Sequence, residues 1–437
     1  MSTPEPLPGD DLFGRGVLRK VAWRLLPFLC LLYLCNGIDR SNVGFARLTM
    51  QKDLGLSDAA FNFGYGIFYF GYLAFEVPAN LLLRRVGARR WMARIMISWG
   101  FVSCATMLVR GVGSFYAVRI FLGVAEAGFF PGVILYLTFW FPARERARVV
   151  ALFMLAIPIT GFVSNLVSGA LLEYLHGAGG LTGWQWLFLA EGLPSVVIGV
   201  LVLLVLPDGP SQASWLGPAE RDWLAGRIEQ EEHYRRERHG ADFLRALLDG
   251  RVWLLIGLYF TVAVGANAAG ANFPDLISKR LPAISKAQVG FLAALPSACA
   301  MVSMVLMGWH SDRTGERRGH VALSAFAAAG GWALSAVAPS PGLFLVGLCI
   351  AQAGMLSMLP TFWALPTSFL SGVAAAGGIA LINSVGNIGG LVGPNIFGKF
   401  GLWGMVVILA AGGVLALFAR HDASLDRGGP GEKAAGA

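Results

Sequence analysis

The sequence predicts an all-α integral membrane protein with twelve transmembrane helices in two pseudo-symmetric six-helix bundles. Of its 437 residues, 56% are hydrophobic and only 14% are charged, whereas about a quarter of the residues in a soluble domain are charged. Apolar stretches of about 20 residues, the length that crosses a bilayer core of roughly 30 Å, recur along nearly the whole chain. We expect spans near residues 24–46, 62–83, 92–110, 115–140, 148–172, 185–206, 252–274, 288–309, 320–338, 342–363, 372–397 and 401–419.

The basic residues orient these spans. An even number of spans places both termini on one side of the membrane, and Lys and Arg favour the cytoplasmic side. With both termini cytoplasmic, roughly 25 basic residues fall in inside segments and about 7 in outside segments. The net charge of +8 therefore reflects topology, and nucleic-acid binding, which needs a basic face on a soluble surface, is not expected.

Three polar segments flank or divide the spans. The tail, residues 1–22, has no small-residue cleavage site after a short apolar core, so the first span should be retained. Residues 207–250 have charges of alternating sign, which is typical of a solvated helix. We expect bundles over 23–206 and 251–420, with the linker and the tail 421–437 also cytoplasmic. The expected location is the bacterial cytoplasmic (inner) membrane.

The two halves of the chain resemble each other. After the second span of the first half, residues 80–90 read NLLLRRVGARR, and the equivalent residues 308–318 of the second half read GWHSDRTGERR. In the fourth span of each half, Ala-Glu-Ala-Gly corresponds to Ala-Gln-Ala-Gly, so that Glu126 corresponds to its neutral isostere Gln352. Transporters are often built from such repeats.

The second-half loop resembles the GxLaDRxGRR signature of the major facilitator superfamily. The stretches IDRSNVGFA, FEVPANLLL, GVAEAGFFPG and WQWLFLAEG are similar to its anion:cation symporter branch, which includes tartrate, phthalate and sugar-acid permeases. The resemblance implies the major facilitator fold and a gating role for these loops. The first loop has Asn80 and Arg84 where the signature has Gly and Asp, which leaves its contacts open. The expected gating residues are Arg85, Gly87, Arg89, Gly308, Asp312, Arg313, Gly315 and Arg317.

Four charged residues lie at membrane depth, where each charge costs at least about 3 kcal/mol. Asp39 and Arg40 are adjacent in the first span, and Arg119 and Glu126 are seven residues apart, on one helical face, in the fourth. The helical rise puts Asp39 and Arg119 at comparable depth, so that an ion pair between them is feasible. Glu126 lies about 10 Å nearer the midplane. A fixed pair that only packs two helices remains the structural alternative.

These charges predict proton-coupled anion binding. With both acids ionised the four charges sum to zero, and each proton taken up leaves one positive charge for a substrate carboxylate, so proton and anion assist each other. Arg40 points about 100° away from Asp39 and can bind a carboxylate with two parallel hydrogen bonds. The resemblance implies that Asp39 and Glu126 are protonation positions and that Arg40 and Arg119 are the membrane arginines.

Uncharged polar residues complete the expected site. Tyr65, Tyr69 and Tyr72 share one face of the second span. We place Tyr72 and Tyr69 at the cavity, whereas Tyr65 fits an interfacial aromatic belt. In the second half, amides are the candidates for binding substrate hydroxyls. The resemblance adds Trp363 as a candidate and supports Asn383, since both match cavity positions of sugar-acid symporters. The amides are Asn267, Asn272, Gln352, Asn383 and Asn387, of which Gln352 could equally pack helices.

Two other acids, Glu76 and Glu191, lie near a span end or a Pro/Gly break, where an ion pair with a loop arginine such as Arg94 is the simpler explanation. The phosphate-loop-like run GPNIFGK is followed by Phe400 where Ser or Thr belongs. The histidines lie in loops or at edges, and HExxH and GxSxG are missing from the sequence. We therefore expect no cofactor, no metal and no enzymatic activity.

The sequence thus predicts a monomeric proton-coupled symporter that imports an organic acid anion, such as a sugar acid, a tartrate-like acid or an aromatic carboxylate. An uncoupled facilitator or a proton-driven exporter is the alternative, because the sequence determines the pathway better than the direction. A receptor that senses an acid without moving it would need a signalling domain, which neither the linker nor the short tails provide.

Overall fold

The computed structural model describes residues 10–236, 249–369 and 372–419, and every regular element within these ranges is helical. Ten helical segments among them are long and apolar enough to cross a membrane. Short 3₁₀ turns occur at Thr106–Leu108, Ala178–Gly180 and Pro210–Gln212. The α-helices are α1 (Asp10–Asp53), α2 (Asp58–Val86), α3 (Ala88–Ala105), α4 (Val112–Glu126), α5 (Phe129–Thr138), α6 (Ala143–Met154), α7 (Ala156–Tyr174), α8 (Gly183–Val205), α9 (Pro218–Arg236), α11 (Gly250–Arg280), α12 (Lys286–Thr314), α13 (Arg318–Val337), α14 (Pro341–Phe369), α15 (Gly372–Gly386) and α16 (Ile388–Phe418).

Glycines explain how the twelve expected spans relate to these ten segments. The segment Leu381–Phe418 turns at Gly401, where φ is 60°, and therefore contains parts of two expected spans. The remaining span is α2, which is rich in tyrosine and glycine and is not among the ten. Within the fourth span, α4 ends at Glu126 and α5 begins after Gly128, which has φ of 84°. Only glycine adopts such positive φ values at little cost.

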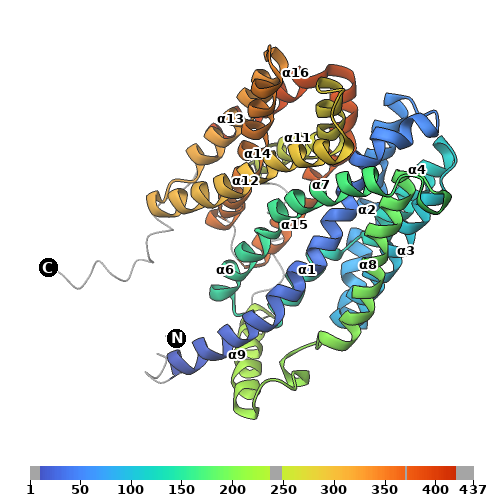
Figure 1. Cartoon of the computed structure of the whole chain (residues 1–437). Coiled ribbons are helices and arrows are strands. Elements are labelled where there is room, and N and C mark those ends of the chain that lie inside the picture. The colour runs from blue at the N-terminus through green and yellow to red at the C-terminus, as the bar shows by residue number, and fades with distance from the viewer. Residues whose placement is uncertain (1–9, 237–248, 370–371, 420–437) are drawn as a thin grey trace.

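The helices form two bundles, coloured blue to green and yellow to red in Figure 1. In the first, α3 packs against α8 and α2 against α4, and in the second α13 packs against α14 and α11 against α16. The two bundles meet where α7 packs on α12, α2 on α16 and α1 on α11. This arrangement is the predicted fold class.

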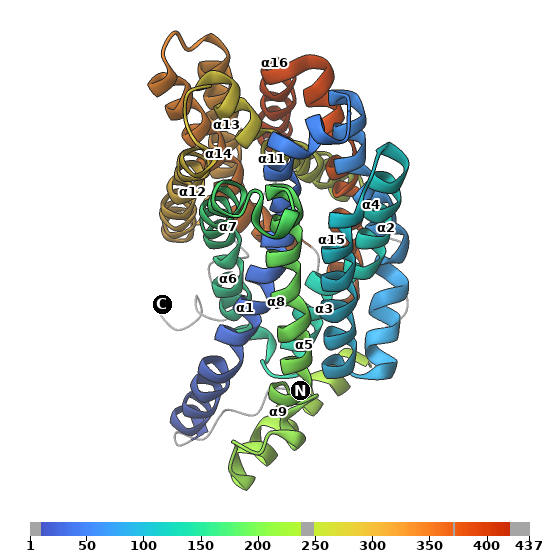
Figure 2. The same cartoon turned by 45° about the vertical axis from the view of Figure 1, so that its right-hand side comes forward.

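The helix α9 lies at the end of the first bundle where α1 begins (Figure 2). The Phe13 and Trp223 rings meet edge to face at 6.2 Å, and Lys20 forms an ion pair with Glu220 at 2.7 Å. The Leu224 side chain is buried in the core of the first bundle. One face of the linker helix is thus packed on α1, which a purely solvated helix would not be.

Small residues bring the bundles into backbone contact between α7 and α12. A Cβ atom added to Gly290 would lie 2.5 Å from the carbonyl oxygen of Asn165, and one added to Gly169 would lie 2.7 Å from the Gly290 Cα. The Asn165 amide also donates to the Ala293 carbonyl at 2.9 Å across this contact. A larger side chain therefore cannot fit unless the helices move apart.

We expect Gly290→Leu to destabilise the protein by about 1–3 kcal/mol, the usual cost of overpacking a closely packed contact. The midpoint of thermal unfolding in detergent, followed by tryptophan fluorescence, measures this effect. Gly330→Leu on α13 is the matched control, because a Cβ atom at this exposed position meets nothing within 4 Å. Equal midpoints for the two variants would contradict the prediction.

Candidate functional site

A cavity of about 270 Å³ lies between the two bundles. The first bundle contributes lining residues from α1, α2, α4 and α7, and the second contributes them from α11, α14 and the junction of α15 with α16. Both charged side chains among the described lining residues are arginines, Arg40 and Arg119. The polar uncharged lining residues are Tyr33, Ser41, Tyr65, Tyr69, Tyr259, Asn267 and Asn387.

Arg40 links the cavity to a buried acid. Its Nε donates to Glu126 Oε1, which also accepts from Asn36 Nδ2 at 2.6 Å. The Arg40 side chain is 33% exposed, whereas that of Glu126 is 2% exposed. The guanidinium also lies 5.0 Å from the centre of the Tyr72 ring and 5.4 Å from that of Phe68, within the range of cation–π attraction. The structure thus brings Arg40, Glu126 and Tyr72 together as one unit.

Arg119 has neutral partners. Its Nε donates to the Gly64 carbonyl at 3.3 Å and its Nη2 donates to the Tyr65 carbonyl at 3.2 Å. The guanidinium lies 4.9 Å from the centre of the Phe68 ring. The ion pair between Arg119 and Asp39 that the helical rise makes feasible is not formed here. The reason is orientation, since Arg119 faces α2 and the cavity while Asp39 faces α3 and α8.

Asp39 lies behind α1, away from the cavity wall, and is 2% exposed. It accepts hydrogen bonds from Trp99 Nε1, from Ser103 Oγ at 2.7 Å, from Ser195 Oγ at 3.0 Å and from Asn42 Nδ2 at 3.3 Å. All four donors are neutral. Of the four membrane charges, the two arginines thus line the cavity, and Glu126 is joined to it through Arg40.

The tyrosines of α2 differ from the expectation in one respect. Tyr69 lines the cavity, and its hydroxyl donates to Asn267 Oδ1 at 2.5 Å, which joins the two bundles. Tyr72 contacts Arg40 but is not a lining residue. The belt interpretation of Tyr65 is wrong, because this side chain is 5% exposed and lines the cavity beside Arg119.

Of the second-half candidates, Asn267 and Asn387 line the cavity, whereas Asn383, Trp363 and Gln352 are not among its described lining residues. Asn383 Nδ2 donates to Glu76 Oε1 at 3.2 Å, and Ser384 Oγ donates to Glu76 Oε2 at 3.0 Å. The Trp363 ring packs against Tyr259, with 5.1 Å between ring centres. The buried Gln352 Oε1 has no hydrogen-bond partner among the described residues.

The sequence suggested that Arg94 forms an ion pair with Glu76 or Glu191, but in the structure it pairs with neither. Its Nη1 donates to the Ala125 carbonyl at 3.4 Å, and its guanidinium lies 4.0 Å from the centre of the Trp91 ring. Glu76 instead bonds to the second bundle, and Glu191 accepts from Ser168 Oγ at 2.7 Å.

Sequence reasoning missed two lining tyrosines and a buried arginine. Tyr33 lies seven residues before Arg40, and Tyr259 eight before Asn267, so helical periodicity places each on the same face as a residue that we had singled out. The same spacing places Arg47 seven residues after Arg40.

Arg47 is 4% exposed and ties α1 to α2 and α11. It donates to Asp58 Oδ1 at 2.5 Å, to Asn62 Oδ1 at 3.2 Å and to Asn272 Oδ1 at 2.6 Å. Its Nε also lies 3.7 Å from Asp275 Oδ2. Asn272, which we had counted among the cavity amides, therefore belongs to this network.

The expected gating residues lie at the α2–α3 and α12–α13 junctions. At the first junction the Arg89 backbone N–H donates to Asp208 Oδ1 at 2.8 Å, and Gly87 has φ of 93°. Arg85 is exposed. A Cβ atom on Gly87 would lie 3.0 Å from the same Asp208 oxygen. The start of the linker therefore contacts this loop.

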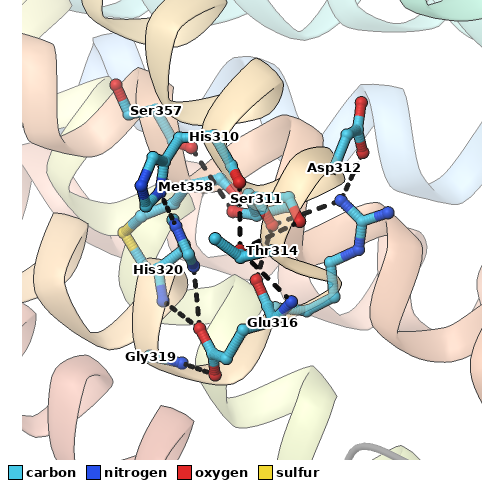
Figure 3. A network of polar contacts seen from close by, with 11 residues as sticks. His310, Ser311, Asp312, Thr314, Glu316, Gly319, His320, Ser357 and Met358 are labelled. Carbon is cyan, nitrogen blue, oxygen red and sulfur yellow. Dashed lines mark hydrogen bonds and ion pairs between the residues drawn. The ribbon is translucent and has the colours of Figure 1, made fainter. Parts of the chain in front are cut away.

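The α12–α13 junction holds a polar network, drawn in Figure 3. Arg317 Nη1 lies 2.5 Å from Asp312 Oδ1 and donates to Ser311 Oγ at 3.2 Å, while Gly315 ends α12 with φ of 66°. The Arg313 guanidinium lies 4.3 Å from the centre of the Trp309 ring. A Cβ atom on Gly308 would lie 3.8 Å from Pro360.

Glu316 and two histidines complete this network. His310 Nδ1 lies 2.7 Å from His320 Nε2, and Glu316 accepts from the Gly319 N–H at 2.6 Å. Partial burial raises the pKa of Glu316, but the hydrogen bonds from Gly319 and His320 outweigh burial and hold this pKa below its usual value. Within the described ranges, no group of three His, Cys, Asp or Glu side chains could hold a metal ion.

Apolar helices in two bundles around a polar cavity define a multi-pass membrane transporter. The profile of the Major Facilitator Superfamily matches residues 29–394, and the chain belongs to this family.

Relatives of stated function are similar over most of the chain. A "Putative tartrate transporter" of Agrobacterium vitis is 49% identical over 89% of this chain and 86% of its own length. A "Quinolone resistance transporter" of Acinetobacter baumannii is 41% identical over 87% of this chain and 88% of its own. The inward-open xylose transporter XylE of E. coli has a TM-score of 0.73 at 14% identity, over 92% of this chain and 97% of its own, which shows the shared fold.

We expect Arg47→Met to destabilise the protein by about 2 kcal/mol, because it removes charge-assisted hydrogen bonds from buried amides that then lack a partner. The thermal unfolding midpoint in detergent should fall by several degrees. Lys52→Met, at an exposed position near the end of the same helix, is the control and should leave the midpoint unchanged. A midpoint for Arg47→Met within one degree of that control would refute this role.

Proposed function

We propose that the protein is a proton-coupled symporter that imports an organic acid anion by alternating access. The observation that supports this most is the position of Arg40, which faces the cavity and is held by buried Glu126. When Glu126 takes up a proton, its attraction for the guanidinium weakens, and the planar fork of Arg40 can bind a substrate carboxylate. Proton and anion then increase each other's affinity, which is the reciprocity that coupling requires.

The second arginine supports an acidic substrate with more than one polar group. Arg119 lines the cavity and donates to two backbone carbonyls, so its charge has no acidic hydrogen-bond partner among the described residues. With Glu126 neutral, the wall carries two positive charges. The surrounding tyrosine hydroxyls and amides could bind substrate hydroxyls. A short hydroxy acid with one or two carboxylates fits this chemistry, in keeping with the name of the tartrate relative.

The movement that we propose is a rocking of the N-terminal bundle (23–206) against the C-terminal bundle (251–420). The contacts of Arg47 with Asn272 and of Glu76 with Asn383 would open and close during this movement. We also propose that the protein is a monomer in the inner membrane. Its termini are then cytoplasmic, as are the tails 1–22 and 421–437 and the linker 207–250.

An exporter or an uncoupled facilitator is the second candidate, which the name of the quinolone resistance relative favours. Counterflow in proteoliposomes separates the candidates. A facilitator exchanges substrate without responding to a pH gradient, whereas a symporter accumulates substrate on the side to which protons flow. An exporter moves substrate against the proton flow.

We expect Glu126→Gln to abolish pH-driven accumulation, because the amide cannot take up and release a proton. Proteoliposomes with an acidic outside should then only equilibrate labelled substrate, while counterflow persists. Glu229→Gln on the exposed face of α9 is the control and should accumulate substrate like the wild type. Full accumulation by Glu126→Gln would show that this residue does not couple the proton.

We expect Arg119→Gln to weaken the binding of a dicarboxylate more than that of a monocarboxylate. Loss of a charge-assisted contact should lower the affinity for tartrate about tenfold, equivalent to about 1.4 kcal/mol. Competition against labelled substrate measures both affinities. Arg40→Gln provides the comparison, since it should weaken both ligands alike. Equal losses for both ligands in Arg119→Gln would exclude a second carboxylate subsite there.

A further inference from the structure

Two histidines face each other across the α12–α13 junction, outside the cavity (Figure 3). His310 lies near the end of α12, and His320 lies in the first turn of α13. The distance from His310 Nδ1 to His320 Nε2 is 2.7 Å, and the two ring centres are 5.0 Å apart. This contact joins the two helices directly, beside the turn that carries the expected gating residues.

Glu316 sets the protonation of one ring. Its Oε2 lies 2.7 Å from His320 Nδ1, and its carboxylate accepts from the backbone N–H groups of Gly319 at 2.6 Å and of His320 at 3.2 Å. Partial burial raises the pKa of Glu316, but these hydrogen bonds hold it below its usual value, so Glu316 is ionised at neutral pH. An ionised carboxylate can only accept hydrogen bonds. His320 Nδ1 therefore carries a hydrogen, and His320 offers Nε2 to His310.

The contact between the rings holds one hydrogen atom, because a hydrogen bond needs a donor on one nitrogen and a lone pair on the other. When both imidazoles are neutral, His310 Nδ1 donates to His320 Nε2. One further proton, on either ring, still leaves a single hydrogen between these two nitrogens. With both rings protonated, two N–H groups point at each other across 2.7 Å. The contact therefore survives a charge of zero or one on the pair and is lost when both rings are charged.

The charges nearby compensate one imidazolium but not two. Glu316 is the acid that contacts the pair within the described ranges. Asp312 is engaged by Arg317, with 2.5 Å between Oδ1 and Nη1. The helix α14 packs against both α12 and α13 and contains no Asp, Glu, Lys, Arg or His, and its Ser357 and Met358 lie beside the histidines (Figure 3). The other charged side chains of the junction are those of Arg313 and Arg318. A second proton on the pair thus adds to an excess of positive charge.

We propose that His310 and His320 form a pH-sensitive clasp, which is closed at neutral pH and is opened by acid when both rings are protonated. Histidine side chains usually titrate between about pH 5 and 8, so moderate acidification is sufficient. The turn that the clasp closes carries the ion pair between Asp312 and Arg317. The closed clasp holds this gating turn in place, and acid releases it. Opening by acid does not depend on the proposed function. A slowing of transport by that release, on the side to which import delivers protons, rests on the proposed function.

NMR of isotope-labelled histidine rings in the full-length protein, titrated in detergent micelles across the range in which histidine ionises, tests the clasp. The two rings should take up protons in two separate steps, about one pH unit or more apart, because strongly interacting groups titrate as a pair. In His310→Gln, His320 should instead titrate in one step. His176→Gln is the control, since it removes a histidine that accepts from the Gly183 N–H between α7 and α8 and should leave both steps unchanged. Independent titration of the two rings, with the His320 curve unaltered in His310→Gln, would overturn the proposal.

Glu316→Gln keeps both histidines and removes the negative charge that compensates them. The first step should move to lower pH, because a neutral amide stabilises an imidazolium less than a carboxylate does. A first step that stays at the wild-type pH would contradict the role of Glu316 in the clasp.

Counterflow of labelled tartrate in proteoliposomes with equal pH on both sides tests the effect on transport. On acidification the wild-type rate should fall at least about twofold more than the His310→Gln rate, because a glutamine can donate to neutral His320 or accept from protonated His320 and so keeps the clasp closed. Equal losses in the two proteins would show that the clasp does not act on transport. The two proposals can fail separately, since counterflow needs no proton gradient. Full coupling in Glu126→Gln would leave the clasp intact, and independent titration of the histidines would leave the Glu126 result standing.

Discussion

The ion pair between Arg40 and Glu126 is the interaction around which the rest of the site is arranged. A lone charge at membrane depth is unfavourable, and a charge that is kept there needs a partner and hydrogen bonds. Glu126 is the last residue of α4, and the chain then bends at Gly128, so that the acid sits at a helix end facing α1. Asn36 and Tyr72 complete the surroundings. The Arg40 side chain remains partly exposed at the cavity, where the proposed binding of a substrate carboxylate is possible.

The two acids that we had grouped together have different environments. Glu126 is compensated by Arg40, a cation that lines the cavity, whereas Asp39 is held by four neutral donors from α1, α3 and α8. Adjacent positions on α1 thus carry an acid that faces α3 and α8 and an arginine that lines the cavity.

The contacts between the bundles combine apolar packing with polar links. Within a bundle the helices meet mainly through buried apolar side chains. Between the bundles, the close backbone contact of α7 with α12 is accompanied by separate polar links such as Tyr69 with Asn267. Hydrogen bonds between amides, hydroxyls and a carboxylate can exchange partners at small net free-energy change. Such an interface suits two bodies that move against each other.

The sequence by itself determined the helical membrane fold, the family and the direction of Arg40, because hydropathy, the motif residues and the 100° step of a helix are local properties. Three polar residues that it singled out, Tyr69, Asn267 and Asn387, line the cavity. Only the tertiary structure decided what each helix face meets. Asp39 bonds to Trp99 and Ser195, which lie 60 and 156 residues away, and no periodicity contains this information. Arg119 and Tyr65 were misassigned for the same physical reason, since the side of α4 and α2 that borders the cavity depends on how the bundles pack.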